Sequence, residues 1–200
     1  MKTIFITIFE GVEVKNVLRT PILTDLLKEK DIKIVLFTKS KEKVDFYKKE
    51  FNDKKLVFEC VEWEQTSKID HFFGKLKFVL LKTETTDLKR LMLFEIDKKR
   101  FSYISGKIVN TFFARSFFRK VARFFDFLLV QDNIYKIFFD KYKPDLVFMA
   151  HLFDEPEIAL LREAKKRKVK TVGFVNSWDK VTARCMMRLL PDKAVVFNSL

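Results

Sequence analysis

Short runs of β-branched and aromatic residues alternate with segments of helical period in the first sixty residues. The runs with strand character are Thr3–Phe9, Ile32–Thr38 and Leu56–Val61. Apolar residues between them recur at helical spacing over Val14–Lys30 and Lys41–Phe51. Short buried strands joined by crossover helices pair in parallel, so this pattern predicts a β-α-β-α-β unit. Within the first helical segment, Pro21 either kinks the helix or occupies its first position; Ser40 is expected to cap the second helix.

The pattern of strands resumes after a long segment without them. Residues 68–142 have helical period and are rich in Phe and basic residues, which predicts a helical insert. The expected elements that follow are strands over Leu146–Ala150, Thr171–Val175 and Ala194–Phe197, and a helix over Glu155–Arg167. Two such halves with right-handed crossovers predict an α/β fold, a Rossmann-like doubly wound parallel sheet with strand order 3-2-1-4-5-6. We expect one domain over residues 1–200.

Composition excludes several classes of site. The chain has 24 Phe and 4 Gly, which leaves little material for Gly-rich phosphate-binding loops. Cys60 and Cys185 lack zinc-ligand spacing, and His71 and His151 are the only histidines, so no His-rich metal site and no cofactor is predicted. The apolar N-terminus is too short for a signal peptide, and no stretch approaches the roughly 20 apolar residues of a spanning helix. We expect a cytoplasmic chain that can touch the inner face of a membrane.

A ligand crevice is expected at the carboxyl ends of the strands that flank the change of direction in a doubly wound sheet. The loops predicted there are residues 10–15, 151–155 and 176–182. His151 and Glu10 are candidate general bases, because an imidazole or carboxylate can accept a proton from a hydroxyl near neutral pH. Asp154 and Glu155 are candidate substrate-binding residues, with capping of the following helix as the alternative role of Asp154.

Two further groups of polar residues lie in these predicted loops. One group consists of Lys15, Asn16 and Arg19. These residues either bind a phosphate at a helix N-terminus or are solvated helix residues. Asn176 precedes Ser177, Trp178 and Asp179, which together offer a hydroxyl, a stacking ring and a carboxylate to a sugar. The alternative is that Ser177 or Asp179 caps a helix while Trp178 packs on the core.

Several segments carry a resemblance to a known family. They are Thr171–Thr182 with its Ser-Trp-Asp turn, Leu190–Asn198, Lys15–Thr20, Pro144–Val147 and Ala159–Arg167. Together they resemble the N-terminal domain of GT-B-type glycosyltransferases of bacterial surface-polysaccharide biosynthesis. The chain departs from that pattern at Lys15, where Arg is common, and in lacking a Gly pair after the first strand.

The resemblance implies that two domains of the enzyme bind different substrates. The N-terminal domain receives a glycan or lipid-linked acceptor, and a C-terminal domain binds the nucleotide-sugar donor. The sequence ends in a strand followed by the cap-like Asn198-Ser199, from which we expect that the donor domain is missing. Catalysis would use His151, Glu10 and Asp179 without a metal. Nucleotide-sugar epimerases and polyol-phosphate transferases share the fold and remain alternatives.

The net charge of +13 is concentrated in the Phe-rich segment. Residues 98–123 hold eight basic side chains and no acidic one. Arg115, Arg119 and Arg123 are predicted to share one helix face, beside an apolar stripe of Phe113, Phe117, Val121 and Phe124. This pattern is typical of a helix that lies on an anionic membrane, with Arg115, Phe117, Arg119 and Arg123 in contact.

Two other interpretations of the basic segment stay open. The Phe stripe can pack on the sheet while the Arg residues are solvated. A basic, non-catalytic module that binds membranes or nucleic acid is also possible, but the aromatic-basic strand motifs of RNA-binding sheets are missing, so nucleic acid is the less favoured partner.

Overall fold

The computed structural model describes residues 1–200 except 65–66, 178–179, 184 and 197–200, and omits the side chains of 182–183. Contacts within the chain divide it into two compact units. The sheet unit comprises residues 1–64, 132–176 and 191–200, and the helical unit comprises residues 65–131 and 177–190. The sequence led us to expect one domain with an insert that starts near residue 68. That residues 177–190 join the helical unit was not anticipated.

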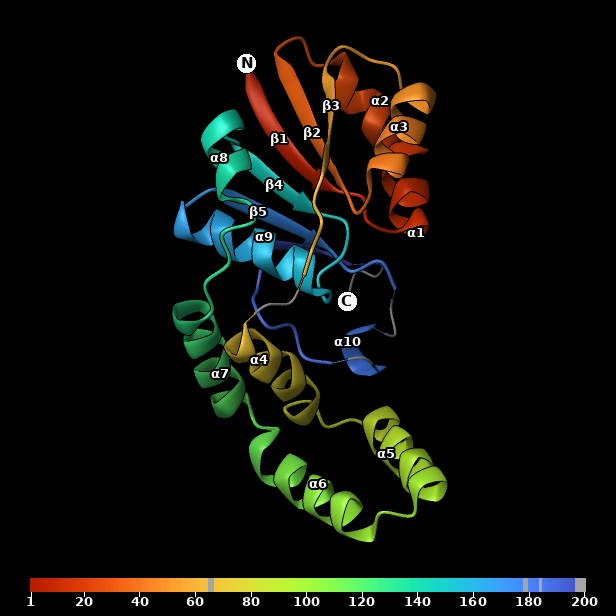
Figure 1. The fold of residues 1–200 in the computed structure, drawn as a ribbon, viewed down its shortest axis with the longest axis vertical. Helices are drawn as coiled ribbons and strands as arrows, with labels where there is room; N and C mark the ends of the chain where they lie inside the picture. The colour runs from red at the N-terminus through yellow and green to blue at the C-terminus, as the bar shows by residue number, and fades with distance from the viewer. Residues whose placement is uncertain (65–66, 178–179, 184, 197–200) are drawn as a thin grey trace. The chain divides into compact units, whose positions relative to one another are not determined.

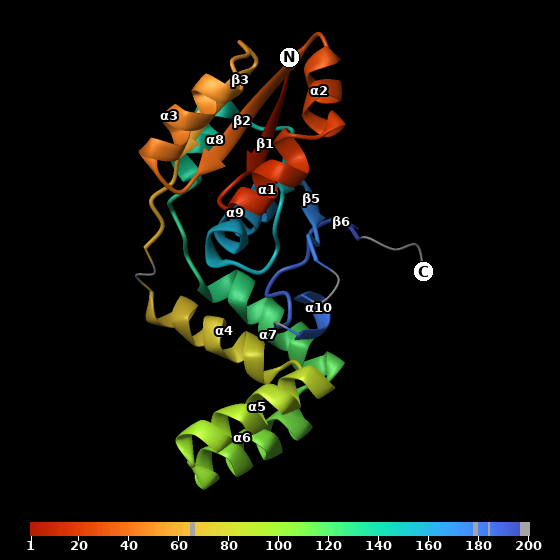
Figure 2. The ribbon, with the colours of Figure 1, turned by 90° about the vertical axis from the view of Figure 1, so that its right-hand side faces the viewer.

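The sheet unit contains six parallel strands in the order β3-β2-β1-β4-β5-β6 (Figure 1; β6 is labelled in Figure 2). They are β1 (Lys2–Thr7), β2 (Ile32–Thr38), β3 (Leu56–Cys60), β4 (Leu146–Met149), β5 (Lys170–Phe174) and β6 (Lys193–Val195). The predicted Rossmann-like doubly wound fold and its strand order are therefore confirmed. The predicted strand ends differ from these by up to two residues.

The helices of the sheet unit follow the predicted crossovers, with one exception. They are α1 (Gly11–Glu13), the π-helical turn η1 (Val14–Leu18), α2 (Pro21–Lys28), α3 (Lys41–Glu50), α8 (Lys136–Tyr142) and α9 (Glu155–Lys166). The helix expected over Val14–Lys30 is interrupted: Arg19 N bonds Val14 O at 3.1 Å, and a new helix begins at Pro21 after the N-cap Thr20. Ser40 caps α3 as predicted, since its side chain accepts from Lys43 N.

Alternate residues of the strands build a core on each face of the sheet. One face carries aliphatic side chains that pack with Leu23 of α2 and Val44 of α3; they include Ile6, Ile8, Ile34 and Leu36. The other face carries Phe5 and Phe37, and Phe5 packs edge-on against Phe139 of α8 with ring centroids 5.1 Å apart. Figure 1 shows α2 and α3 on one side of the sheet and α8 on the other. Because both faces of the sheet are buried, the sequence of each of these strands is a nearly continuous run of apolar residues.

The predicted helical character of the Phe-rich segment is confirmed. The helical unit contains α4 (Lys68–Val79), α5 (Glu84–Asp97), α6 (Arg100–Phe113), α7 (Ser116–Leu129) and α10 (Lys180–Ala183). Helices α5 and α6 lie side by side (Figure 2). Asn110 of α6 donates to the carbonyls of Val79 and Leu81, which fixes α6 to the end of α4. Helix α8, which lies within the predicted insert, belongs to the sheet unit.

An ion cluster forms the polar interior of the helical unit. Arg188 is fully buried and makes two bonds to the Asp126 carboxylate of α7, at 2.6 and 3.0 Å. Its Nη2 also donates to Asp70 of α4 at 2.7 Å. The guanidinium therefore joins segment 177–190 to two helices, since planar forks of this kind bind carboxylates bidentately.

Candidate functional site

The candidate site lies at the carboxyl ends of β1 and β4, neighbouring strands at which the sheet changes direction. In open parallel sheets this is where ligands bind. Thr7, at the end of β1, is buried, and its Oγ1 accepts from Ala150 N just after β4 at 3.0 Å. This bond holds the starts of the two following loops together.

Glu13 is the first of three buried ionisable side chains at this edge. Its Oε2 accepts from Phe9 N at 2.6 Å and from Glu10 N at 3.0 Å, so the carboxylate binds the free amides at the start of α1. Its Oε1 has no partner in the described part of the chain. The side chain is 1% exposed, and burial is the main cause that raises its pKa to about 6.

His151 and Glu157 complete the group. His151 follows β4 and is 2% exposed; its Nδ1 accepts from Phe153 N at 3.2 Å and lies 3.6 Å from Asp154 Oδ2. Glu157, in the first turn of α9, is 1% exposed, and neither carboxylate oxygen accepts a hydrogen bond from the described residues. Burial, and next the charge of Glu13, raise the pKa of Glu157 well above its ordinary value.

These three residues form what we term the carboxyl-edge triad. Glu13, His151 and Glu157 each offer one nitrogen or oxygen atom, and the three atoms lie within 4.8 Å of one another. Tyr135 lies buried on the same face of the sheet as Phe37, and its hydroxyl has no partner among the described residues. Burial, followed by the charge of Glu157, raises its pKa well above 10. Two carboxyl groups and an imidazole in such a place can hold either protons or a cation.

The predicted catalytic residues differ in how accessible they are. Glu10 is the N-cap residue of α1, and its side chain is 50% exposed and pairs with Lys39. His151 is almost fully buried. Asp154 occupies the N-cap position of α9, but its side chain makes no capping bond and is 28% exposed. Glu155 begins α9 and is half-buried.

The Ser-Trp-Asp segment is described only in part. Trp178 and Asp179 lie outside the described residues. Asn176 belongs to the sheet unit, and its Oδ1 is buried without a partner in the described part of the chain. Ser177 belongs to the helical unit. The proposed sugar-binding role of this segment stays a prediction.

The predicted phosphate-binding residues do not lie at a helix N-terminus. The first helix begins at Gly11, one turn before Lys15, which is exposed. Asn16 is half-buried within η1. Arg19 ends η1, and its Nε and Nη2 donate to the Glu50 carboxylate at 2.8 and 3.1 Å. Its charge is therefore already matched.

The arrangement predicted for the membrane-contacting residues is wrong in part. Arg115 is the N-cap residue of α7, and Phe113 belongs to α6, so only Arg119 and Arg123 of the three arginines lie within the helix. Arg123 is partly buried and donates to Met187 O at 3.0 Å, and burial lowers the pKa of its guanidinium. Phe117, in contrast, is 68% exposed, as membrane contact would require.

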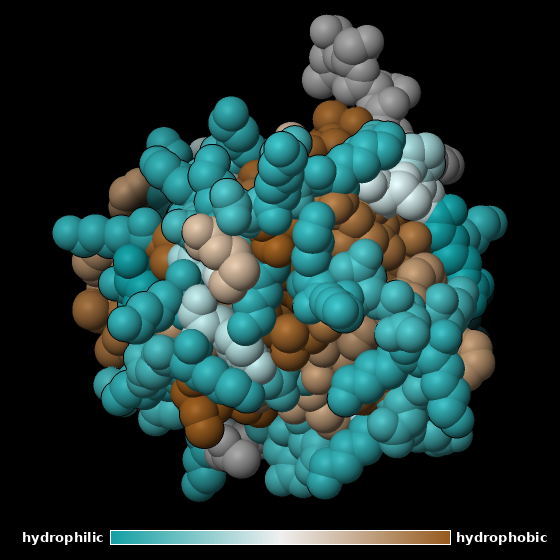
Figure 3. Space-filling model, turned by 90° about the horizontal axis from the view of Figure 1, so that it is seen from above, coloured by the Kyte–Doolittle hydropathy of each residue, from teal (hydrophilic) through white to brown (hydrophobic). Residues whose placement is uncertain are grey.

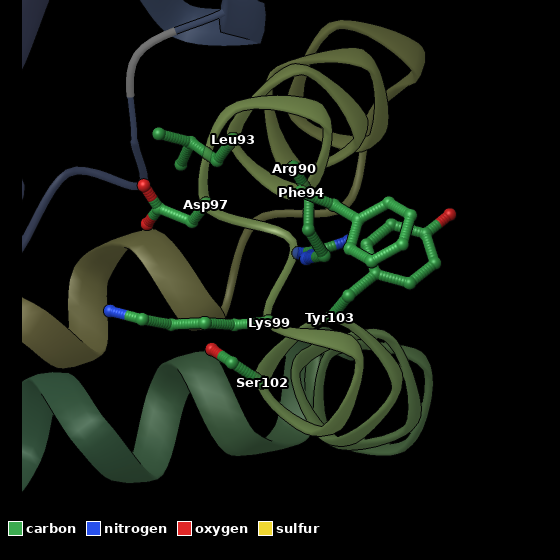
Figure 4. A pocket seen from close by; sticks show the side chains of 7 residues that line it. All are labelled: Arg90, Leu93, Phe94, Asp97, Lys99, Ser102 and Tyr103. Atoms are coloured by element: carbon green, nitrogen blue, oxygen red, sulfur yellow. The ribbon is translucent and has the colours of Figure 1, made fainter.

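Two other hollows of the chain differ from this site in their lining. One of about 130 Å³ lies between α5 and α6 (Figure 4), where Lys99 and Asp97 lie on one side and the rings of Phe94 and Tyr103 on the other. The second, of about 720 Å³, lies at the amino ends of the strands beside Ile4. Figure 3 looks onto that end and shows hydrophobic residues amid a mainly hydrophilic face. In neither do the described lining residues include a buried carboxyl group whose oxygens accept no hydrogen bond, of the kind that Glu157 provides at the carboxyl edge.

Sequence reasoning missed Glu13 and Glu157. The sequence did contain an indication that Glu157 is buried. Glu157 stands between Pro156 and the apolar run that begins at Ile158, within a helix expected to pack on the sheet. Glu13 could have been noticed as the third residue of a helix after Glu10, the position from which a Glu reaches back to the N-cap amide. The short helix that contains Glu13 was not recognised, because the π-helical turn that follows it interrupts the helical period.

Comparison of the chain with family models, with curated proteins and with solved structures gives no match. None of the helices in the described residues combines the length and the apolar character needed to cross a bilayer. The function is therefore argued from the site.

Proposed function

We propose that this chain is the acceptor-binding part of a GT-B-type glycosyltransferase that acts on a glycan or a lipid-linked acceptor. The observation that carries the proposal is the pair of accessible carboxylates, Glu10 and Asp154, at the switch point of a sheet with order 3-2-1-4-5-6. The resemblance of Thr171–Thr182 to the Ser-Trp-Asp turn of these enzymes adds to it. In such enzymes a second domain binds the nucleotide-sugar.

The proposed chemistry needs a group that removes a proton from the acceptor hydroxyl. As the hydroxyl oxygen forms a bond to the anomeric carbon, the bond to the nucleotide breaks and the proton passes to the base. The base has to be reachable, and the exposed side-chain fractions are 50% for Glu10, 28% for Asp154 and 2% for His151. Glu10 and Asp154 are therefore favoured over His151 as the group that meets the acceptor.

The test is a comparison of Glu10→Gln and Asp154→Asn in the longest natural form of the protein. A panel of nucleotide-sugars is assayed for release of the nucleotide. Loss of the base is expected to lower kcat by about 10²- to 10⁴-fold in one of the two variants, with little change in the KM of the donor. Glu42→Gln, an exposed carboxylate of α3, is the control. Undiminished turnover in both variants would contradict the assignment, and no turnover with any donor would contradict the proposed reaction.

A specific observation supports attachment to the inner face of the membrane as a second property. Large apolar side chains of α6 and α7 are exposed to solvent in the helical unit. They are Phe101 (87%), Ile104 (55%), Ile108 (52%), Phe112 (59%), Phe117 (68%), Phe124 (62%) and Leu128 (58%). Lys98, Lys99 and Arg100 precede them in the chain. Apolar burial and about 1 kcal/mol from each basic residue near the surface would favour an anionic bilayer.

Vesicle sedimentation tests this attachment. The chain is expected to bind vesicles rich in phosphatidylglycerol and not vesicles of phosphatidylcholine alone, with binding that weakens as salt increases. Phe117→Ser combined with Phe124→Ser should weaken binding at least tenfold. Phe46→Ser in α3, a Phe of the sheet unit that is 58% exposed, is the matched control. Equal binding by the double variant and the control would exclude α7 as the contact.

A further inference from the structure

Among the described residues, no cation forms an ion pair with the two carboxyl groups of the carboxyl-edge triad. Glu13 Oε1 and both oxygens of Glu157 are buried and accept no hydrogen bond from the described residues. The nearby ammonium groups are engaged elsewhere: Lys39 pairs with Glu10, and Lys43 donates to Phe9 O at 3.0 Å. Buried carboxylates without a partner are costly, so such groups normally hold protons or ligate a metal.

We infer that Glu13, His151 and Glu157 bind one divalent cation of the Zn²⁺ class. Two carboxylates balance the charge of such an ion, and a neutral imidazole supplies the third ligand. A mixed set of one nitrogen and two oxygens suits Zn²⁺, whereas Ca²⁺ takes six to eight oxygens and Mg²⁺ is bound mainly by carboxylates and water.

The positions of the three ligand atoms fit this class of ion. Zn²⁺ binds nitrogen and carboxylate oxygen at about 2.1 Å, which places tetrahedral ligand atoms about 3.4 Å apart. The triad atoms lie within 4.8 Å of one another, so movements of under about 1 Å in each side chain close the site. Three protein ligands leave a fourth position open, as in catalytic zinc sites.

The surroundings of the triad support its use as a ligand set. Metal-bound histidines commonly donate their second ring N–H to a carboxylate, and Asp154 Oδ2 lies 3.6 Å from His151 Nδ1. When Nε2 ligates the ion, the neutral ring carries its proton on Nδ1, which would donate to Asp154 in place of accepting from Phe153 N. Glu13 is held by two backbone amides through Oε2, which leaves Oε1 for the ion. This site is independent of the proposed transferase activity, because it depends only on the three side chains and the fold that buries them.

The experiment titrates Zn²⁺ alone into the 200-residue chain by calorimetry, with metal content checked by mass spectrometry after gel filtration. The background is His71→Ala with Cys60→Ser, which removes the exposed histidine and the half-buried cysteine outside the triad. One equivalent is expected to bind and to raise Tm, because an ion that binds only the folded state stabilises it. Glu157→Gln and Glu13→Gln should each weaken binding at least tenfold and remove the rise in Tm.

Glu163→Gln is the matched control, since Glu163 is a buried carboxylate of the same helix whose charge Arg167 already balances. It should bind Zn²⁺ as the background chain does. Folding of every variant is checked by circular dichroism, and because two separate Gln variants are used, failure of one to fold leaves the other as the test. Uptake by the background chain far below one equivalent, which would mean adventitious binding only, would overturn the inference. So would unchanged affinity in both variants, or a zinc-edge X-ray absorption spectrum without a histidine ligand.

Discussion

Replacing Arg188 by Met is expected to destabilise the helical unit severely. Arg188 is fully buried, and its guanidinium bonds the carboxylates of Asp126 and Asp70, themselves 1% and 3% exposed. Met fills a similar volume but leaves the two buried carboxylates without this cation. Removing one partner of a buried ion pair costs about 3–5 kcal/mol.

That loss is large compared with the stability available. A folded unit of this size has a free energy of unfolding of about 5–10 kcal/mol, so Arg188→Met should remove about a third of it or more. Urea unfolding followed by circular dichroism, with hydrogen exchange of α4 and α7, measures the change. Exchange should increase first in these two helices, because Asp70 and Asp126 lie in them.

A second variant separates the loss of the ion pair from the loss of packing. Arg188→Met combined with Asp70→Asn and Asp126→Asn removes the uncompensated charges and should recover part of the lost stability. Arg100→Met, an exposed arginine at the start of α6, should change the free energy of unfolding by no more than about 0.5 kcal/mol. The reasoning is refuted if Arg188→Met unfolds within about 1 kcal/mol of the parent chain.

Three smaller predictions concern the sheet unit. Gly173→Ala should destabilise it by about 1–3 kcal/mol in urea unfolding, because a Cβ there would overlap the side chain of Leu152. Ser40→Ala should cost about 1 kcal/mol in the same assay through loss of the α3 cap. Asp192→Ala should cost about 1 kcal/mol at pH 7, because the carboxylate accepts from Thr171 N and Oγ1 at 2.9 and 3.0 Å. The backbone bond from Thr171 is the main cause that lowers the pKa of Asp192 below 3.8. The Asp192 carboxylate therefore contributes its full stabilisation above pH 3.8, and this stabilisation is lost as the pH falls through the lower pKa that Asp192 has in the folded state. The difference in the free energy of unfolding between Asp192→Ala and the parent chain should shrink over that pH range.

Each of these has a result that would contradict it. Gly11→Ala is the control for the first, since a Cβ at Gly11 meets no atom within 4 Å, and the two alanine variants should not unfold alike. A Ser40→Ala chain as stable as the parent would mean that water replaces the cap. A stability difference for Asp192→Ala that grows below pH 3.8 would reverse the sign of the linkage.

Much of the sheet was predictable from local sequence. β-branched and aromatic runs located the strands because both faces of a parallel sheet are buried, so the runs are apolar throughout. Right-handed crossovers between two β-α-β halves then favoured the order that the structure shows. The N-cap role of Ser40 followed from backbone chemistry that involves only neighbouring residues. For Pro21 the same chemistry left a kink or a first helical position, and the structure shows the second.

The candidate site was only half predictable. His151, Glu10 and Asp154 were found because they follow strands at the switch point. Glu13 and Glu157 were not, because a charged residue in a sequence is normally assigned to the surface, and whether it is buried depends on what packs over it. The π-turn after Glu13, which no periodicity indicated, is part of the path that turns this carboxylate inward.

Sequence alone determined the order of elements, since periodicity and capping act over a few residues. Only the tertiary structure decided which charged side chains are inside. Arg188 forms ion pairs with Asp70 and Asp126, which are 118 and 62 residues away in the sequence. Glu13 lies close to His151 and Glu157, which come from the other half of the sheet. The folded backbone brings such residues together. Because a buried charge without a partner is costly, each of these groups needs a partner that is close in space, and sequence separation does not limit which one.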